Sequence, residues 1–413
     1  TPDNSGKREV FSAFVELGIP LISNEMRVPF IKNFDLQLAA RYEDFSDIGS
    51  KSVPKISFGW QVDDSFYFRG SWSKGFRVPN LVQVNETIVS RQIFGVDALL
   101  CLQQINNNGE IDYCDYSFQR VARGSKNLRP EESTNISLGI IYEPKNIDNL
   151  VFTIDWWEIE KEDTIGLFGE DNILLSDLVL RMETNNISDC SLVQSSPYVF
   201  RDSLEENEIQ EYLQAGICPA GRVTRVEEQY RNLDTRIISG FDFSARYFVR
   251  NNFGNFNFIL NIAKLEKFRQ EAGNDFIKLI DAQEKGVIPQ ELAITGFSNL
   301  IEKDGSPKIQ ASFKFLWNKG PWGLGLFGRH IGEFYETRNK LRDGRLWKVR
   351  AYNTINTFID YNFKISESQS SLRFGINNIA DERAPLASDI FGYYIDKHDN
   401  IGRSYYINFM HRF

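Results

Sequence analysis

The sequence predicts an all-β protein, an antiparallel transmembrane β-barrel with long loops on one rim. Three observations lead to this fold class. Segments of about ten residues alternate apolar and polar side chains, which is the period of a strand with two different faces. The links between these segments are short and long in turn, as on the two rims of an outer-membrane barrel. No apolar run reaches the roughly 18 residues that a transmembrane helix needs, whereas alternating strands need no such run.

Thirteen segments show this alternation. In one of them, Ile309, Phe313 and Phe315 fall on one predicted face, and Gln310 and Lys314 fall on the other. The segments are 11–19, 34–43, 55–62, 65–72, 134–143, 150–164, 236–250, 255–266, 308–317, 322–335, 350–364, 371–379 and 403–413. Aromatic residues lie near the ends of several apolar faces, where a membrane girdle would place them. These residues are Trp60, Trp72, Tyr142, Tyr247, Trp317, Trp322 and Tyr361.

The links between the segments have two lengths. Short links lie around 63–64, 144–149, 251–252, 318–320 and 366–369, and long loops cover about 76–130, 166–234, 267–307, 336–349 and 381–402. The second long loop should contain two short helices. One is expected over 204–215, because Ser203 and Glu206 have the spacing of a capping box and Gly216 suits the end. The other is expected over 171–183.

All four cysteines lie in two of the long loops. Four cysteines allow three pairings, and sharing a loop favours Cys101–Cys114 and Cys190–Cys218. Closing a loop of about 15 residues stabilises the fold by about 3 kcal/mol in the chain-entropy account. Paired thiols indicate an oxidising compartment such as the periplasm or the cell surface. The alternative is four reduced, unrelated thiols.

The composition restricts the function classes. The 413 residues carry a formal net charge of −9, whereas a nucleic-acid-binding surface should be basic, so we expect no nucleic-acid partner. Neither cysteine pair has Cys-x-x-Cys spacing, and only three histidines are present, so we predict no metal site and no cofactor. Glu158, Glu160 and Glu162 share one face of a strand, which we interpret as a solvated row rather than a hydrolase site.

Three stretches and the C-terminus resemble elements of one protein family. Segment 68–79 ends in Gly-Phe-Arg-Val-Pro and is similar to that family's Gly-Phe-Arg-Ala-Pro element, with Val in place of Ala. Segment 127–133, Asn-Leu-Arg-Pro-Glu-Glu-Ser, resembles its Leu-Lys-Pro-Glu-x-Ser element. Segment 375–382, Gly-Ile-Asn-Asn-Ile-Ala-Asp-Glu, resembles its Asn-Asn-Leu-Phe-Asp-Glu element. The chain stops on Phe413, with Ile407 and Phe409 on the same face, which looks like the family's barrel-assembly signal; His411 stands where the family often has Tyr.

The family that these elements resemble is that of the TonB-dependent outer-membrane receptors, and the resemblance implies an architecture and a set of partners. The family has a 22-stranded barrel filled by an N-terminal plug, so residues 1–413 would be one domain, the last thirteen strands of that barrel. The plug, about nine upstream strands and the coupling box would be absent from this chain. The implied partners are outer-membrane lipid, the plug and upstream strands, a TonB-type energising complex reached through the plug, and a small-molecule ligand. The implied location is the outer membrane of a Gram-negative bacterium.

Candidate binding residues lie in the first long loop. Aromatic and arginine side chains bind sugars, aromatic siderophores or peptides by stacking and charge-assisted hydrogen bonds, and packing between loops is the alternative role for each. The candidates are Arg91, Tyr113, Tyr116, Phe118, Arg120 and Arg123. Arg69 and Arg329 are expected to face the lumen, where they would contact the plug or an anionic ligand.

The resulting hypothesis is the energised import of a scarce siderophore, vitamin or oligosaccharide, with no catalytic residue. Two alternatives stay open. One is a passive porin or a surface adhesin barrel, which would have no plug. The other is a secreted, disulfide-stapled β-rich hydrolase, which would stay in solution without detergent.

Overall fold

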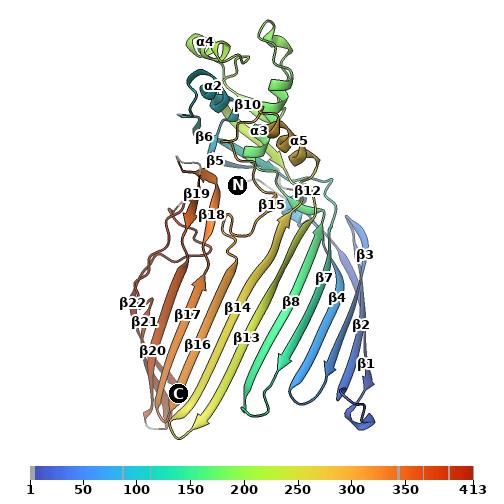
Figure 1. Ribbon diagram of the computed structural model, residues 1–413, viewed down its shortest axis with the longest axis vertical. Coiled ribbons are helices and arrows are strands. Elements are labelled where there is room, and N and C mark those ends of the chain that lie inside the picture. Colours follow the sequence, from blue (N-terminus) through green and yellow to red (C-terminus); the bar gives the residue numbers. More distant parts are fainter. Residues whose placement is uncertain are drawn as a thin grey trace.

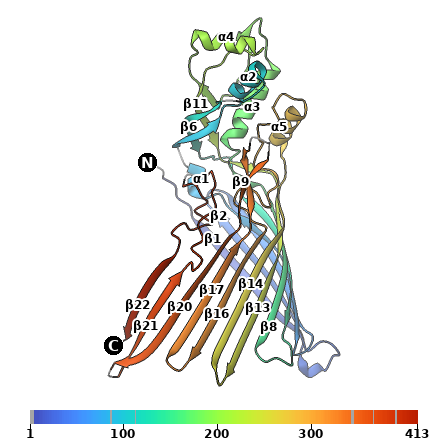
Figure 2. The same cartoon turned by 60° about the vertical axis from the view of Figure 1, so that its left-hand side comes forward.

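The structure, a computed structural model, describes residues 5–85, 88–111, 113–341, 345–365, 367–388 and 391–412. It consists of one large antiparallel sheet and a smaller loop domain that stands over one rim of the sheet (Figures 1 and 2). No helix in these ranges is long and apolar enough to cross a membrane.

The large sheet follows the chain in order, and each strand of its main path pairs with the preceding one in antiparallel fashion. Each of the thirteen alternating segments overlaps one strand of this path. The strands are β1 (Val10–Ile22), β2 (Asn33–Phe45), β3 (Gly49–Gln61), β4 (Phe66–Arg77), β7 (Glu131–Tyr142), β8 (Leu150–Glu162), β13 (Arg236–Asn251), β14 (Gly254–Gln270), β16 (Ile309–Lys319), β17 (Trp322–Ile331), β20 (Tyr352–Ile365), β21 (Ser368–Asn377) and β22 (Ser404–Arg412). The short β15 (Ser298–Asn299) pairs with β14 off the path.

The sheet is open in the described residues, because β1 and β22 end the path and are not paired with each other. The predicted barrel wall is therefore present as a curved antiparallel sheet, while a closed barrel is not. Two edges with unpaired backbone groups follow from this arrangement.

The two faces of the sheet differ in polarity. Phe258 and Leu260 of β14 lie on the apolar face and are 43% and 36% exposed. Asn261, the residue after Leu260, lies on the polar face. Ile407 of β22 is 73% exposed on the apolar face. A face that exposes so many large apolar side chains is typical of a wall that borders lipid.

The rims of the sheet differ in the length of their connections (Figure 1). At the lower rim the links are short, such as residues 252–253 between β13 and β14, and the longest of them, residues 23–32 between β1 and β2, contains η1 (Asn24–Met26). At the upper rim most links are long, and they contain smaller helices and strands. These are α1 (Leu81–Asn85), β9 (Thr164–Gly166), β12 (Arg231–Leu233), β18 (Phe334–Lys340) and β19 (Leu346–Val349).

Three of the long loops fold together into the loop domain, which has its own hydrophobic core. Its sheet has the order β10-β11-β6-β5, and β6 and β11 are parallel although they come from different loops. Its elements are β5 (Val89–Val96), α2 (Ala98–Asn108), β6 (Asp115–Arg123), α3 (Glu170–Glu183), η2 (Cys190–Leu192), β10 (Val199–Arg201), α4 (Glu206–Gln214), β11 (Val223–Gln229) and α5 (Asn274–Glu284). Leu99, Leu178 and Val226 are fully buried in the core.

The two predicted helices are present as α3 and α4, but the predicted capping box is wrong. The box is formed by Glu205 and Glu208, and the backbone N–H of Glu205 donates to Glu208 Oε2 at 3.2 Å. Glu205 is therefore the N-cap of α4, and Ser203 and Leu204 lie before the helix, where Leu204 packs against the loop-domain core. Gly216 follows the C-cap with φ +76°, a conformation that favours glycine.

Candidate ligand-binding site

Two surfaces carry the polar side chains that a ligand would meet. One is the polar face of the large sheet, which is the predicted lumen wall. The other is the surface of the loop domain above it (Figure 2).

Arg69 lies on the polar face and forms a two-point ion pair with Asp155. Its Nε and Nη2 donate to the two carboxylate oxygens at 2.9 and 2.6 Å. The pair spans β7, which lies between the two strands, and it does so above Gly139. A Cβ at position 139 would stand 2.0 Å from Asp155 Oδ1, so glycine makes the room for this pair.

A cavity of about 480 Å³ lies further along the polar face. Asp242 accepts a hydrogen bond from Trp157 Nε1 at 3.1 Å, and Ser244 donates to Asn261 Oδ1 at 3.1 Å. Arg329 also lines the cavity, on the same face as Arg69. Carboxylates, hydroxyls, amides and one guanidinium thus share this space with apolar side chains such as Phe243 and Ala311, a mixture that suits a ligand with both polar and apolar parts or the surface of a neighbouring domain. The role of the two arginines in such contacts stays a prediction.

Two of the six candidate residues from the first loop lie inside the loop domain. Phe118 is 1% exposed and belongs to the core. The Tyr116 hydroxyl donates to Asp97 Oδ2 at 2.7 Å and accepts from the backbone N–H of Val223 at 2.6 Å. Burial and the neighbouring Asp97 carboxylate raise the pKa of Tyr116. These two side chains hold loops together in this structure.

Two further candidates form ion pairs within the loop domain. Arg120 donates from Nε to Glu228 Oε1 at 2.5 Å, and Arg123 pairs with Glu227 at 2.9 Å. Burial raises the pKa of Glu228, and the Arg120 guanidinium opposes that rise without cancelling it.

The remaining two candidates face solvent. Tyr113 is 78% exposed, and Arg91 lies opposite Arg120 in the β5–β6 ladder on an exposed position. The structure therefore brings the six residues into one domain without gathering them in one pocket. A ligand-binding role for them stays a prediction.

Sequence reasoning missed a buried charge network at the centre of the loop domain. Arg201 donates to both oxygens of Asp97 at 2.9 and 3.0 Å and to Asp177 Oδ2 at 3.3 Å. Burial alone would lower the pKa of Arg201, but the Asp97 and Asp177 carboxylates outweigh it and raise the pKa. Asp97 also caps α2 by accepting from the backbone N–H of Leu99. No local pattern reveals this network, because its members come from two loops.

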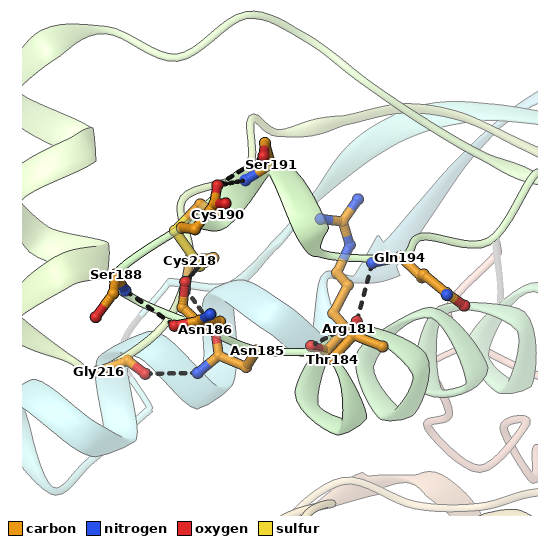
Figure 3. Close-up of a disulfide and its surroundings, with 11 residues drawn as sticks. Arg181, Thr184, Asn185, Asn186, Ser188, Cys190, Ser191, Gln194, Gly216 and Cys218 are labelled. Atoms are coloured by element: carbon orange, nitrogen blue, oxygen red, sulfur yellow. Dashed lines mark hydrogen bonds between the residues drawn. A yellow bond between two sulfur atoms is a disulfide. The ribbon is translucent and has the colours of Figure 1, made fainter.

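The two predicted disulfides, Cys101–Cys114 and Cys190–Cys218, are confirmed. Figure 3 shows the second one beside the end of α3. The Asn185 side chain donates to the carbonyl of Gly216 and accepts from the backbone N–H of Cys218, both at 2.9 Å. Thr184 Oγ1 accepts from the backbone N–H of Gln194 at 2.9 Å. The disulfide and these bonds fasten α3 to the segment that follows α4.

The predicted assembly signal is only partly within the described residues. Phe409 lies beside Ile407 on the apolar face of β22 and is 58% exposed. Phe413 lies outside the described residues. Among the described residues, no group of three or more His, Cys, Asp or Glu side chains is placed to hold a metal ion.

Comparisons with known proteins decide the family. A family model described as "TonB dependent receptor-like, beta-barrel" matches residues 1–379. The chain belongs to the TonB-dependent receptor family. Members of this family are outer-membrane proteins of Gram-negative bacteria that bind small molecules such as siderophores and work with TonB.

Individual TonB-dependent receptors are similar to this chain, and the share of the chain that matches differs between them. The probable TonB-dependent siderophore receptor PirA of Acinetobacter baumannii is 26% identical over 131 residues, which are 32% of this chain and 15% of that protein. The crystal structure of PirA from Acinetobacter baumannii matches 97% of this chain and 45% of its own, with 18% identity and a TM-score of 0.57. A variant of the ferric enterobactin receptor PfeA from Pseudomonas aeruginosa matches 97% of this chain and 44% of its own, with 15% identity and a TM-score of 0.56. The chain thus spans under half the length of these solved structures.

Proposed function

We propose that this chain is the C-terminal part of the barrel of a TonB-dependent importer that takes up a scarce ligand, a ferric siderophore in the first place. The observation that supports this most is the joint placement of two features on one side of the molecule. A cavity whose lining includes Asp155, Asp242 and Arg329 lies on the inner face of the sheet, and a compact loop domain stands above it. The names of the similar proteins reported above refer to a siderophore receptor or to a ferric enterobactin receptor.

The open sheet supports a further part of the proposal. Edge strands in hydrocarbon leave backbone groups unpaired at several kcal/mol each, so β1 and β22 need partners in a membrane. We propose that upstream strands of the same receptor supply those partners and that a plug domain occupies the polar face. TonB would then act through the plug, in the outer membrane of a Gram-negative bacterium.

The test is uptake of iron-55 by iron-starved cells that produce the whole receptor containing this chain. Catecholate and hydroxamate ferric complexes are supplied one at a time, in strains with and without functional TonB. The proposal expects accumulation of one complex that stops when TonB is absent. Passage that continues without TonB would favour a passive porin, and surface binding without accumulation would favour an adhesin.

A pair of variants connects the assay to the polar face. Arg329→Ala removes the guanidinium that lines the cavity and should raise the concentration needed for half-maximal uptake. Lys145→Ala is the matched control. Lys145 is exposed, pairs with Asp63 at the lower rim of the sheet and does not line the cavity. Equal uptake by both variants would show that Arg329 does not contribute to uptake.

A further inference from the structure

A second cavity lies at the outer end of the loop domain, between α2 and α4. Both helices belong to the part of the molecule farthest from the short turns (Figures 1 and 2). The cavity has a volume of about 440 Å³, within the range of small-ligand sites. None of its lining residues lines the cavity on the polar face of the sheet.

Side-chain amides dominate the wall that α2 contributes. Gln103, Gln104, Asn107 and Asn108 line it, and Gln214 faces them from α4. Two hydrogen bonds hold this arrangement in place: Asn107 Nδ2 donates to the carbonyl of Glu211 at 2.9 Å, and Gln104 Nε2 donates to the carbonyl of Tyr113 at 3.2 Å. An amide both donates and accepts, which matches neighbouring hydroxyl groups on a ligand.

Gln103 is the residue that points most directly to a ligand. Its side chain is 4% exposed and lines the cavity, yet its amide forms no hydrogen bond within the described part of the chain. Its amide atoms are not among the fully buried unpartnered atoms of the described residues, so the space that they reach is the cavity. A ligand hydroxyl in the cavity would supply both the missing donor and the missing acceptor.

The charge and the exposed ring narrow the ligand class. Glu208 and Glu211 line the cavity and outnumber Arg222, so an anionic ligand such as a ferric tris-catecholate would be repelled. Tyr113, 78% exposed at the same cavity, offers a ring face for stacking. We propose that this cavity binds a short neutral oligosaccharide, at a site separate from the import path. The proposal goes beyond the proposed import function and does not depend on it.

The test uses the whole receptor containing this chain, purified in a detergent without a sugar head group, because a maltoside would compete. The fluorescently labelled receptor is applied to an array of neutral, sialylated and sulfated oligosaccharides. The proposal expects retention on neutral oligosaccharides and little on the acidic ones. It also expects that cells without TonB still bind the same oligosaccharide, which separates this outcome from the fate of the import proposal.

Three variants separate binding from folding. Tyr113→Ala removes an exposed ring and should weaken binding at least about tenfold. Gln103→Leu should weaken binding by at least about the same factor while leaving the thermal stability of the loop domain unchanged, because it removes an amide that faces the cavity and forms no hydrogen bond to another described residue. Tyr198→Ala is the control, since Tyr198 is 53% exposed on the same domain and does not line this cavity.

Three results would overturn the inference. The first is an array on which no neutral oligosaccharide retains the receptor above the level of Tyr113→Ala. The second is binding that survives both Tyr113→Ala and Gln103→Leu. The third is a loss of loop-domain stability in Gln103→Leu, which would assign that side chain a purely structural role.

Discussion

Arg201 shows how much of the loop domain depends on one side chain. It joins Asp97, which caps α2, to Asp177, which lies in the middle of α3, and all three side chains are almost fully buried. Two buried carboxylates near one another are tolerated only with a cation between them. Arg201 therefore determines whether α2 and α3 can pack together.

We predict that Arg201→Met lowers the free energy of unfolding of the loop domain by about 3–5 kcal/mol, because it takes the cation away from the buried Asp97 and leaves the buried Asp177 with Arg181 as its cationic partner. The measurement is protease resistance of the loop domain as a function of urea concentration. Arg129→Met is the matched control, since Arg129 pairs with Asp163 on the surface and is 70% exposed in its side chain. The control should lose less than about 1 kcal/mol, and equal losses in both variants would contradict the prediction.

The candidate residues of the first loop show what a sequence can and cannot reveal at this scale. Aromatic and arginine residues in a loop suggest a binding surface, and Tyr113 does lie on one. Phe118 has the same local context but is buried, because β11, more than a hundred residues later, packs beside it. Burial that depends on a distant segment leaves no local pattern to detect.

Among the elements, the strands of the large sheet were the most predictable. A strand with one polar and one apolar face must alternate, and this pattern is visible without knowledge of the partners. The disulfides were predictable for a similar reason, since each joins cysteines of one loop. The helices α2 and α5 and the parallel pairing of β6 with β11 were not predicted, because their apolar faces are matched to other loops rather than to a local repeat.

The last long loop, 378–403, is held to the sheet by a histidine in an aromatic environment. His398 is 4% exposed, stacks on Phe334 and meets the Tyr352 ring edge-on. Both of its ring nitrogens lack a hydrogen-bond partner among the described residues. Burial, together with the positive charges of Arg329 and Lys397, lowers the pKa of His398 from its ordinary value of 6.5.

We predict that acid loosens this loop. A group whose pKa is lowered by folding stabilises the fold above its unfolded pKa and loses that contribution as the pH falls through the folded pKa. Amide hydrogen exchange over residues 391–402 should therefore become faster at about pH 5 than at about pH 7.5, after correction for the intrinsic rate. His398→Phe keeps a ring in place and should abolish the difference; the same acid response in that variant would refute the role of His398.

At the scale of the whole molecule, the two faces of the sheet explain why the chain can serve as a wall. The apolar face exposes Leu260, Ile359 and Phe374 at 36%, 43% and 42%, which in water would be an aggregation hazard. The polar face carries the Arg69–Asp155 pair and the cavity, which in lipid would be costly. Both faces are satisfied only when lipid covers the apolar face and water or protein covers the polar face.

We predict that a charge is tolerated on one face only. Leu260→Arg should lower the free energy of unfolding of the receptor in lipid vesicles by about 2–4 kcal/mol, because it places a cation on the lipid side near the middle of β14. Asn261→Arg, one residue further along on the polar face, should have a much smaller effect. Tryptophan fluorescence during urea unfolding is the measurement, and equal losses would contradict the assignment of the faces.

The most direct test of this assignment is a nitroxide scan of β14 in vesicles. Cysteine is introduced singly at 258, 259, 260, 261, 262 and 263, and the four native cysteines do not react because they form two disulfides. We predict that collisions with oxygen are frequent at Phe258, Leu260 and Ile262 and infrequent at positions 259, 261 and 263. A profile without this period of two, or one in which all six positions meet a water-soluble quencher equally, would contradict the assignment of the sheet to a membrane wall.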